Sequence, residues 1–309
     1  MGYIGSELTT KLLSFGHKVT ILDTGWFGNH LADHPNLEVV NKDVRDFDES
    51  LKGTDLVIHL ANIANDPGVD LNQTLSWEVN VLGSYKLLHR SIADGVKAFI
   101  YASSGSVYGI SNLKSVNEST PLLPISAYNK TKMIAEQVLL AAASQIRIFS
   151  VRPATVCGFS PRMRLDLAVN LLTYQALSKG EITILGGKQF RPNIHIQDMV
   201  SVYIHFVNNF ETLQTGIYNA GFENLTIEEI GRIICSIIPA KITFKESNDN
   251  RSYRLDSSKL LSTGFSPKKN ISDAVIELKS QFDSGNLIEK DEWLTVETMK
   301  KLKLDRFLL

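Results

Sequence analysis

The chain opens on two glycines three positions apart, Gly2 and Gly5, at the start of a helix-like segment. Apolar residues recur along this segment with helical spacing, at Leu8, Leu12, Leu13 and Phe15. A strand-like run at residues 18–22 follows and ends in Asp23. A glycine turn, a helix and a strand ending in an acid form the second half of a dinucleotide-binding βαβ unit, in which the glycines admit a pyrophosphate and the acid binds ribose hydroxyls. This pattern predicts an α/β fold around a parallel sheet.

The first half of that unit is a strand leading into the glycine turn, and it is not found, because only Met1 precedes Gly2. In a sheet of order 3-2-1-4-5-6 the first strand is central, and without it the second and fourth strands lose their shared neighbour. Unpaired backbone groups at a buried strand edge are costly. We therefore expect the sequence as given to lack its first strand, through a misassigned start or a shortened sequence, and to fold or bind a dinucleotide poorly in this form. The alternative is a natural variant that fills the gap with another segment.

Strand-like and helix-like runs alternate through the first half of the chain. The strand-like runs lie at residues 37–40, 56–60, 98–103 and 146–151, and the helix-like runs at 6–15, 75–93 and 126–143. This alternation is typical of a Rossmann-type, doubly wound parallel sheet. We predict a dinucleotide-binding domain at residues 1–158 and a smaller, mainly substrate-binding domain at residues 159–309, with some segments crossing back to the sheet. The charged tail from Glu289 is expected to form a surface helix.

Ser104, Tyr128 and Lys132 form a candidate acid–base set. Tyr128 and Lys132 are four positions apart and so share one face of a helix, while Ser104 follows a strand-like run. The pKa of a phenol, about 10, is too high for the group to serve as a base at neutral pH, but a neighbouring cation favours the phenolate. Ser104 can share the proton that moves between Tyr128 and a substrate hydroxyl. These residue types suit the interconversion of an alcohol and a ketone.

The chain resembles the extended short-chain dehydrogenase/reductase family, in its nucleotide-sugar epimerase/dehydratase branch, from Gly2 to about Gly264. The motifs that carry the resemblance are ordered and correctly spaced. They are the glycine turn at 2–6, N-K-D-V-R-D at 41–46, V-I-H-L-A-N at 57–62, E-V-N-V-L-G-S at 78–84, S-S-G-S-V-Y-G at 103–109, R-P-N-I-H-I-Q-D at 191–198 and R-S-Y-R-L-D-S-S-K-L at 251–260. Together these motifs are far more specific than the spacing of Tyr128 and Lys132 alone.

The resemblance implies NAD as the cofactor and a nucleotide-diphosphate sugar as the substrate. The residues implied to bind the cofactor are Gly2, Tyr3, Ile4, Gly5, Asp23, Asp43, Val44, Leu60, Ala61, Asn80, Tyr128, Lys132 and Pro153. Those implied to bind the substrate are Ser104, Thr155, Arg191 and Arg251. Arginines suit a diphosphate because they form bidentate hydrogen bonds with it, and Asp23 favours NAD because its charge repels the 2′-phosphate of NADP. Simple capping roles for Asp23 and Asp43, and solvated roles for the arginines, stay open.

Two departures from the family pattern bear on the reaction. Members that catalyse 4,6-dehydration usually carry an Asp-Glu pair after the catalytic Ser or Thr, where this chain has Gly105 and Ser106. Neither residue can act as a carboxyl acid or base, so dehydration is disfavoured. Many epimerases have an Asn at the position where this chain has Thr155, so the identity of the sugar does not follow from the family pattern.

Composition narrows the remaining classes. The formal net charge of the 309 residues is −1 at pH 7, which gives no electrostatic reason to expect nucleic acid or an acidic membrane surface as a partner. Two cysteines, Cys157 and Cys235, exclude a disulfide framework, and no apolar run approaches the length of a membrane span. The 7 histidines show no metal-binding spacing and no signal peptide is visible, so we expect a cytoplasmic protein without a metal.

We therefore expect a nucleotide-sugar epimerase that acts at C4 through transient oxidation to a ketosugar. An NDP-sugar dehydrogenase or ketoreductase, which releases oxidised or reduced product, is the alternative within the same class. A non-catalytic dinucleotide-binding protein of this fold is the alternative from another class, and the intact Ser104, Tyr128 and Lys132 argue against it. Apolar residues on more than one face of helices 75–93 and 126–143, together with the family pattern, predict a two-fold homodimer.

Overall fold

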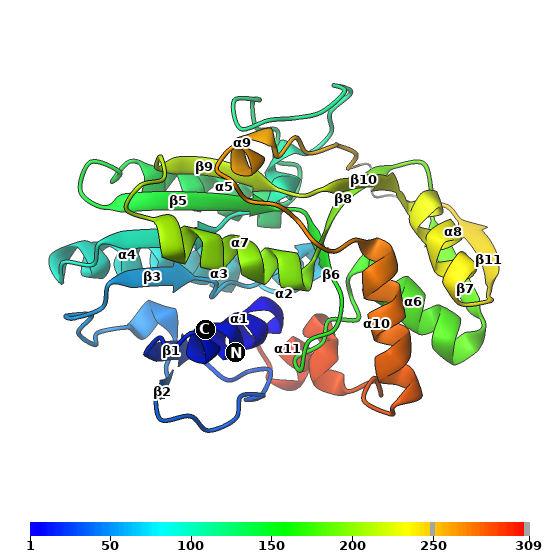
Figure 1. The fold of residues 1–309 in the computed structure, drawn as a ribbon, viewed down its shortest axis with the longest axis horizontal. Helices are drawn as coiled ribbons and strands as arrows, with labels where there is room; N and C mark the ends of the chain where they lie inside the picture. Colours follow the sequence, from blue (N-terminus) through cyan, green and yellow to red (C-terminus); the bar gives the residue numbers. More distant parts are fainter. Residues whose placement is uncertain (248–250, 306–309) are drawn as a thin grey trace.

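The computed structural model describes residues 1–247 and 251–305. Its central layer is a sheet of parallel strands in the order β3-β4-β5-β9 (Figure 1). These strands span Leu56–His59, Ala98–Ala102, Arg147–Pro153 and Gly216–Ala220. The inner strands β4 and β5 are almost wholly buried, which explains their nearly continuous apolar sequences, since both faces of a parallel sheet are covered. The predicted parallel α/β architecture is confirmed.

Two further parallel strands, β1 (Val19–Asp23) and β2 (Leu37–Asn41), pair with each other in a separate sheet. Within the described part of the chain, no strand pairing joins them to β3. In the Rossmann order β1 is the second strand and β3 the fourth, and the residues of both are mostly only half-buried. The structure therefore agrees with the expectation that the second and fourth strands have no shared neighbour.

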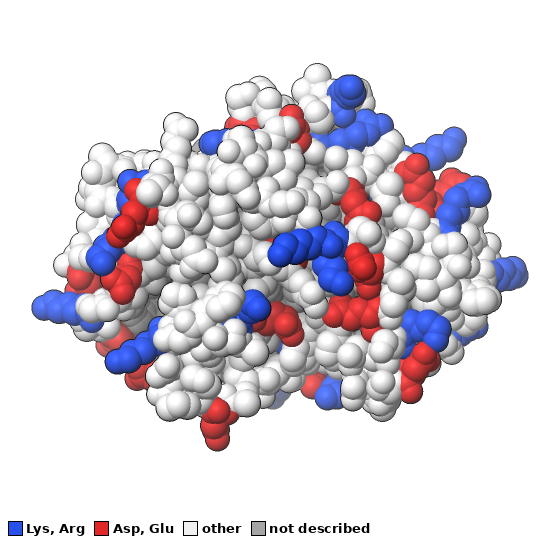
Figure 2. Space-filling view, viewed as in Figure 1, with Lys and Arg blue, Asp and Glu red and all other residues white. Residues whose placement is uncertain are grey.

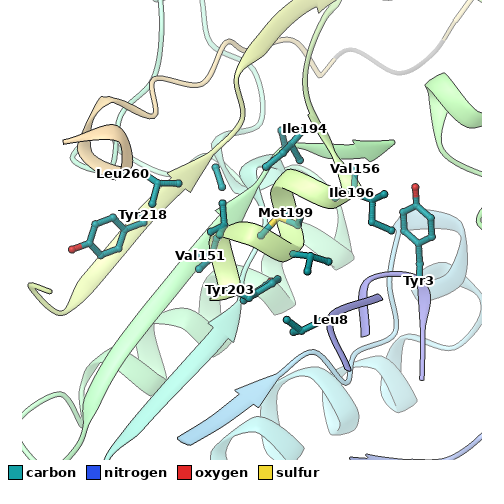
Figure 3. Close-up of a cluster of buried hydrophobic side chains, with 14 of the residues drawn as sticks. Tyr3, Leu8, Val151, Val156, Ile194, Ile196, Met199, Tyr203, Tyr218 and Leu260 are labelled. Atoms are coloured by element: carbon teal, nitrogen blue, oxygen red, sulfur yellow. The ribbon is translucent and has the colours of Figure 1, made fainter. Parts of the chain in front are cut away.

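Helices cover both faces of the central sheet (Figure 1). They are α1 (Tyr3–Ser14) and α7 (Ile196–Asn209) on one face, and α4 (Ser84–Ala93) and α5 (Ala127–Leu140) on the other. Figure 3 shows Leu8 of α1, Met199 of α7 and Val151 of β5 in one buried apolar cluster. Burial of this cluster fixes α1 against the sheet, because apolar surface removed from water supplies about 25 cal/mol per Å².

The predicted helix at residues 75–93 is continuous but not uniform. It consists of α3 (Gln73–Trp77), a wider π-helical turn η2 (Glu78–Gly83) and α4. At Gly83 an added Cβ would lie 2.8 Å from a Val44 side-chain carbon, so only glycine allows this close approach. Single π-helical turns occur most often at functional sites, which draws attention to the residues of η2.

The second half of the chain adds smaller sheets and a separate apolar core. The strands β6 (Thr155–Cys157), β8 (Phe190–His195) and β10 (Glu223–Thr226) form one sheet, and β7 (Glu181–Leu185) pairs with β11 (Lys241–Lys245). The helices α6 (Ala168–Lys179), α8 (Ile227–Ile237) and α10 (Ile271–Asp283) pack around them. In contrast, β9 is a strand of the central sheet and α7 packs on one face of it, although both also belong to the second half.

Short helices and turns complete the described residues. They are η1 (Val44–Asp46), α2 (Asp66–Leu71), η3 (Gly105–Tyr108), α9 (Ser258–Leu261), η4 (Asp291–Trp293) and α11 (Thr295–Lys301). The helix expected after Glu289 is observed as α11, whose apolar side packs against α2 with Met299 buried, while Lys300 and Lys301 are exposed. On the face shown in Figure 2, basic and acidic side chains are intermixed. Among the helices in residues 1–247 and 251–305, none is long and apolar enough to cross a membrane.

Candidate active site

The structure brings Ser104, Tyr128 and Lys132 together at the carboxyl end of β4. Ser104 follows this strand, and α5 carries the other two residues. The first turn of α5 is capped by the Ser126 side chain, which fixes where the helix begins. The Ser104 side chain lies close enough to Tyr128 to lower the pKa of its phenol. The hydroxyl predicted to share a proton with Tyr128 therefore lies in position to do so.

Lys132 is buried beneath this pair. Its Nζ donates to the Ala102 carbonyl at 2.7 Å and lies 6.0 Å from the centre of the Tyr128 ring. Burial lowers the pKa of Lys132 to about 7, and the charge of Glu136 opposes that shift. Lys132 can therefore gain or lose its charge near neutral pH.

Burial dominates the protonation of Tyr128 in the ligand-free protein. It raises the pKa of the phenol, while the hydrogen bond from Ser104 and the charge of Arg164 act in the opposite direction. The sequence predicted that Lys132 would favour the phenolate from beside the hydroxyl, yet its ammonium is hydrogen-bonded to Ala102 instead. A further positive charge at the site would favour the phenolate form of Tyr128.

Asn80 of η2 connects the loop after β3 to α5, the helix that carries Tyr128 and Lys132. Its Oδ1 accepts from the Ile63 N–H at 2.8 Å, and its Nδ2 donates to the Ile63 carbonyl and to Thr131 Oγ1, each at 3.1 Å. Thr131 lies on α5, and Asn80 is fully buried. Asn80 therefore fixes the backbone after β3 against α5, and does not itself face an open pocket.

The amino end of α1 provides a cradle for a phosphate. A Cβ added to Gly2 would meet no atom within 4 Å, and one added to Gly5 would meet only Leu60 Cδ1, at 3.9 Å. The partial positive charge of a helix amino end attracts phosphate groups. Leu60 and Ala61 follow β3 beside this cradle, and both side-chain amide atoms of the next residue, Asn62, are buried without a partner among the described residues. Open space and unpaired polar atoms fit a dinucleotide.

Tyr3 and Ile4 stand in the first turn of α1, but the Tyr3 side chain turns away from the cradle (Figure 3). Its hydroxyl donates to the Gly158 carbonyl at 2.7 Å, and its own carbonyl accepts from Ser160. Ile4 is half-buried against the main apolar core. The side chain of Tyr3 therefore holds α1 to the loop after β6, which leaves only its backbone for a phosphate.

The two predicted adenosine-binding acids already have partners. Asp23 ends β1, and one of its carboxylate oxygens pairs with the amino group of Met1 at 2.5 Å. Asp43 caps η1 and forms two side-chain hydrogen bonds with Arg45, at 2.9 and 3.1 Å. Val44 is buried, so its side chain contributes to packing. Asp23 Oδ1 also accepts from the Gly25 N–H at 2.8 Å, so a capping contact is observed for both acids, at the places that the sequence predicted.

Arg191 and Arg251 meet each other near the catalytic helix. The Arg191 guanidinium donates to the Arg251 carbonyl, and the Arg251 guanidinium pairs with Asp66. Asp66 also accepts from Ser126 at the start of α5, next to Tyr128 on that helix. Two arginines that lie far apart in sequence are thus brought within reach of one site.

A polar cluster lies beside these arginines, of which the sequence predicts only Arg164, as a weaker candidate for binding the diphosphate. Asn65 has a left-handed backbone (φ 67°), and its Nδ2 donates to Asp166 at 2.5 Å. Arg164 binds both oxygens of Asp166, at 2.8 and 2.9 Å. Asn65 and Asp166 come from loops separated by about a hundred residues, so no local spacing signals their contact. Among residues 1–247 and 251–305, no group of three His, Cys, Asp or Glu side chains could hold a metal ion.

The remaining predicted residues flank the site. Pro153 ends β5, and Thr155 begins β6 opposite Asn193 of β8. A Cβ on Gly105 would lie 3.0 Å from the Pro153 carbonyl oxygen and 3.1 Å from Leu255 Cδ1. The structure therefore leaves little room at Gly105 for the carboxylate that dehydratases of the family carry there.

Comparison with known proteins adds sequence and structural relatives. The family model described as the NAD dependent epimerase/dehydratase family matches residues 1–221. A UDP-glucose 4-epimerase of Lactobacillus helveticus is 27% identical, and the match covers 89% of this chain and 92% of that protein. A UDP-glucuronic acid decarboxylase 1 of Danio rerio is 28% identical over 78% of this chain, but only 59% of that protein is covered.

A solved structure shares nearly the whole fold. The UDP-N-acetylglucosamine 4-epimerase of Methanobrevibacter ruminantium M1, in complex with UDP-N-acetylmuramic acid, superposes with a TM-score of 0.80 at 26% identity. The superposition covers 91% of this chain and 96% of that one.

Proposed function

This chain belongs to the NAD-dependent epimerase/dehydratase family, and on that premise we propose that it epimerises a nucleotide sugar at C4, with NAD as its cofactor. The observation that carries the proposal is the contact of Ser104 with Tyr128 above the buried Lys132, at the end of β4. The relatives that act as 4-epimerases support the position of the inverted carbon.

The residues divide the chemistry among themselves. When bound, NAD would accept a hydride from the sugar carbon and later return it to the same carbon. Tyr128 removes the proton from the sugar hydroxyl that becomes a carbonyl, and later gives a proton back. Ser104 lies beside Tyr128 and shares the proton that moves between the phenol and the sugar hydroxyl, and Lys132 lowers the cost of the phenolate once its amine is charged. Asn80 keeps α5 in register with the loop after β3.

The cofactor would lie along the carboxyl ends of the strands, and its pyrophosphate would lie at Gly2 and Gly5. Asp23 would bind the adenosine ribose in place of its contact with Met1. Asn62 has two buried amide atoms that could bond to the dinucleotide. On the other side of Tyr128, Arg191 and Arg251 would bind the sugar nucleotide's diphosphate.

Dehydration is a weaker candidate for this site. It requires a carboxylic acid and a carboxylate beside the reacting carbons, and residues 105 and 106 supply neither. An NDP-sugar dehydrogenase would use the same three catalytic residues, so cofactor turnover must separate it from an epimerase.

The proposal is tested by incubating the chain with NAD and, in turn, UDP-glucose and UDP-N-acetylglucosamine. Proton NMR would detect the C4 epimer, and absorbance would detect NADH. We expect an epimer to form with no net NADH. NADH that accumulates in step with product would identify a dehydrogenase instead, and bound NAD without any turnover would favour the non-catalytic alternative.

A further inference from the structure

Asn129 directly follows Tyr128 on α5, and the mechanism above gives it no role. Its side chain is fully buried, although Asn is seldom fully buried. Its Nδ2 donates to Ser106 Oγ at 2.8 Å, while its Oδ1 has no partner in the part of the chain that the structure describes. The only described side chain that this buried amide bonds is therefore a hydroxyl in the loop that carries Ser104.

Ser106 passes this contact on to Ser104. The two hydroxyl oxygens lie 2.7 Å apart, and the Ser106 backbone N–H also donates to Ser104 Oγ, at 3.2 Å. A hydroxyl has one proton and two lone pairs, and Ser106 uses one lone pair to accept from Asn129. Either hydroxyl of the Ser104–Ser106 pair could donate, and we infer that Ser106 gives its proton to Ser104, because this direction leaves the Ser104 proton for Tyr128. Ser104 then accepts two hydrogen bonds, and its own proton is free to point at the Tyr128 oxygen.

We propose that Ser106 and Asn129 are positioning residues that direct the Ser104 proton toward Tyr128, through hydrogen bonds running Asn129 to Ser106 to Ser104 to Tyr128. Donation to the phenol oxygen favours the phenolate, which is the form that removes the substrate proton. This inference rests on the proposed function for its consequence in catalysis, but the hydrogen-bond direction can be tested without substrate.

The direction explains why a neutral side chain stands at position 106. A carboxylate there could only accept, so it would draw the Ser104 proton toward itself. Ser104 would then offer Tyr128 an acceptor, which favours the protonated phenol. The hydroxyl of Ser106 both fills this position and keeps the chain of donors pointing in one direction.

Other groups also act on Tyr128, and they must stay constant in any test. On the same helix as Tyr128, the charged group that faces it is Lys132. The ionisable groups from other elements are Asp66 of α2, Tyr101 of β4, Arg164 in the loop after β6, Tyr203 of α7 and Arg251. Substitution of Ser106 and Asn129 by neutral residues changes none of these charges.

The test is a double-mutant cycle of Ser106→Ala, Asn129→Leu and the combined variant, with Ser106→Thr as the conservative control. Tyrosine labelled with carbon-13 at Cζ reports the ionised fraction of Tyr128, whose signal is identified with Tyr128→Phe. The fraction is compared at one alkaline pH at which circular dichroism shows all variants folded, with and without NAD. We expect about a tenfold lower ionised fraction in Ser106→Ala, because the Ser104 proton is then no longer directed at Tyr128 and the phenolate loses the hydrogen bond from Ser104.

Ser106→Thr should keep the parent fraction, and the combined variant should match Ser106→Ala, because Asn129 acts through Ser106. An unchanged fraction in Ser106→Ala, a Ser106→Thr that behaves like Ser106→Ala, or additive effects in the combined variant would each overturn the inference. The titration needs no substrate. A chain with the expected titrations but no epimerisation would therefore refute the proposed function and not the hydrogen-bond direction.

Discussion

At the residue scale, burial decides which side chains carry charge. The site places a lysine and a tyrosine where burial disfavours the charged form of each, and Lys132 and Tyr128 shift in opposite directions as a result. His59, at the end of β3, is buried too and bonds Ser84 Oγ at 2.8 Å. In the ligand-free protein, burial therefore favours the neutral form of each of these three side chains.

His59 should make the protein sensitive to acid. Burial, assisted by the charge of Lys132, lowers its pKa from 6.5 to about 3, so below 6.5 the unfolded chain binds a proton that the folded chain refuses. As the pH is lowered from 6.5 to about 3, the free energy of unfolding should decrease by at most about 1.4 kcal/mol per pH unit. His59→Gln should lose less stability than the parent on acidification from about pH 7 to about pH 5, by roughly 1–2 kcal/mol. Urea denaturation measures this, and His89→Gln, on the exposed side of α4, is the control; equal losses in parent and His59→Gln would contradict the prediction.

Asp23 should set the preference between the two dinucleotides. Its carboxylate at the end of β1 repels a 2′-phosphate, so NAD should bind more tightly than NADP, and Asp23→Asn should narrow the difference. Calorimetric titration of both cofactors measures the ratio of their dissociation constants. Glu38→Gln, which removes a carboxylate from the neighbouring strand β2, should leave that ratio unchanged. NADP binding as tight as NAD in the parent would show that Asp23 does not play this role.

At the element scale, the strands differ in whether they are hydrogen-bonded to a neighbouring strand on one side or on both sides. β4 is bonded to β3 and β5 and is almost fully buried. In contrast, β2 is the only strand among the described residues that is bonded to β1, whose side chains are mostly half-buried. Local opening costs least where few buried contacts are lost. We predict that the amides of β1 exchange with deuterium at least about tenfold faster than those of β4. Exchange followed by mass spectrometry on peptic fragments measures this, and equal protection would mean that another segment stabilises β1.

Local sequence predicted most elements but not how they deviate from regular geometry. The apolar runs of β4 and β5 and the glycine turn of α1 gave bounds within about two to three residues, because burial and turn geometry leave a local signature. The π-helical turn at Asn80 leaves no such signature, and the close approach of its Gly83 to Val44 joins residues that are far apart in the sequence. The contact of Asn65 with Asp166, and the hydrogen bond from Asn129 to Ser106, depend likewise on loops that only the folded chain brings together.

At the scale of the whole molecule, the helical layer formed by α3, η2 and α4 exposes large apolar side chains. Leu82 is 57% exposed, Tyr85 46% and Trp77 37%. Such neighbouring exposure is typical of a contact surface. We propose that this layer pairs with its copy in a two-fold homodimer. Sedimentation velocity should show a dimer that Leu82→Glu dissociates, while Leu185→Glu, at an exposed apolar position on β7, leaves it intact; a monomer at all concentrations would refute the proposal.

The central claim is that Tyr128 transfers the substrate proton in an epimerisation that leaves NAD unchanged overall. The most direct test compares the parent with Tyr128→Phe, which removes one oxygen and keeps the ring. Epimer formation from UDP-sugars is followed by NMR, and NAD affinity by calorimetry. The account predicts at least about a 100-fold loss of turnover with NAD affinity within about threefold of the parent. Turnover within about tenfold of the parent would contradict it, because a site without the phenol would then be doing the same chemistry.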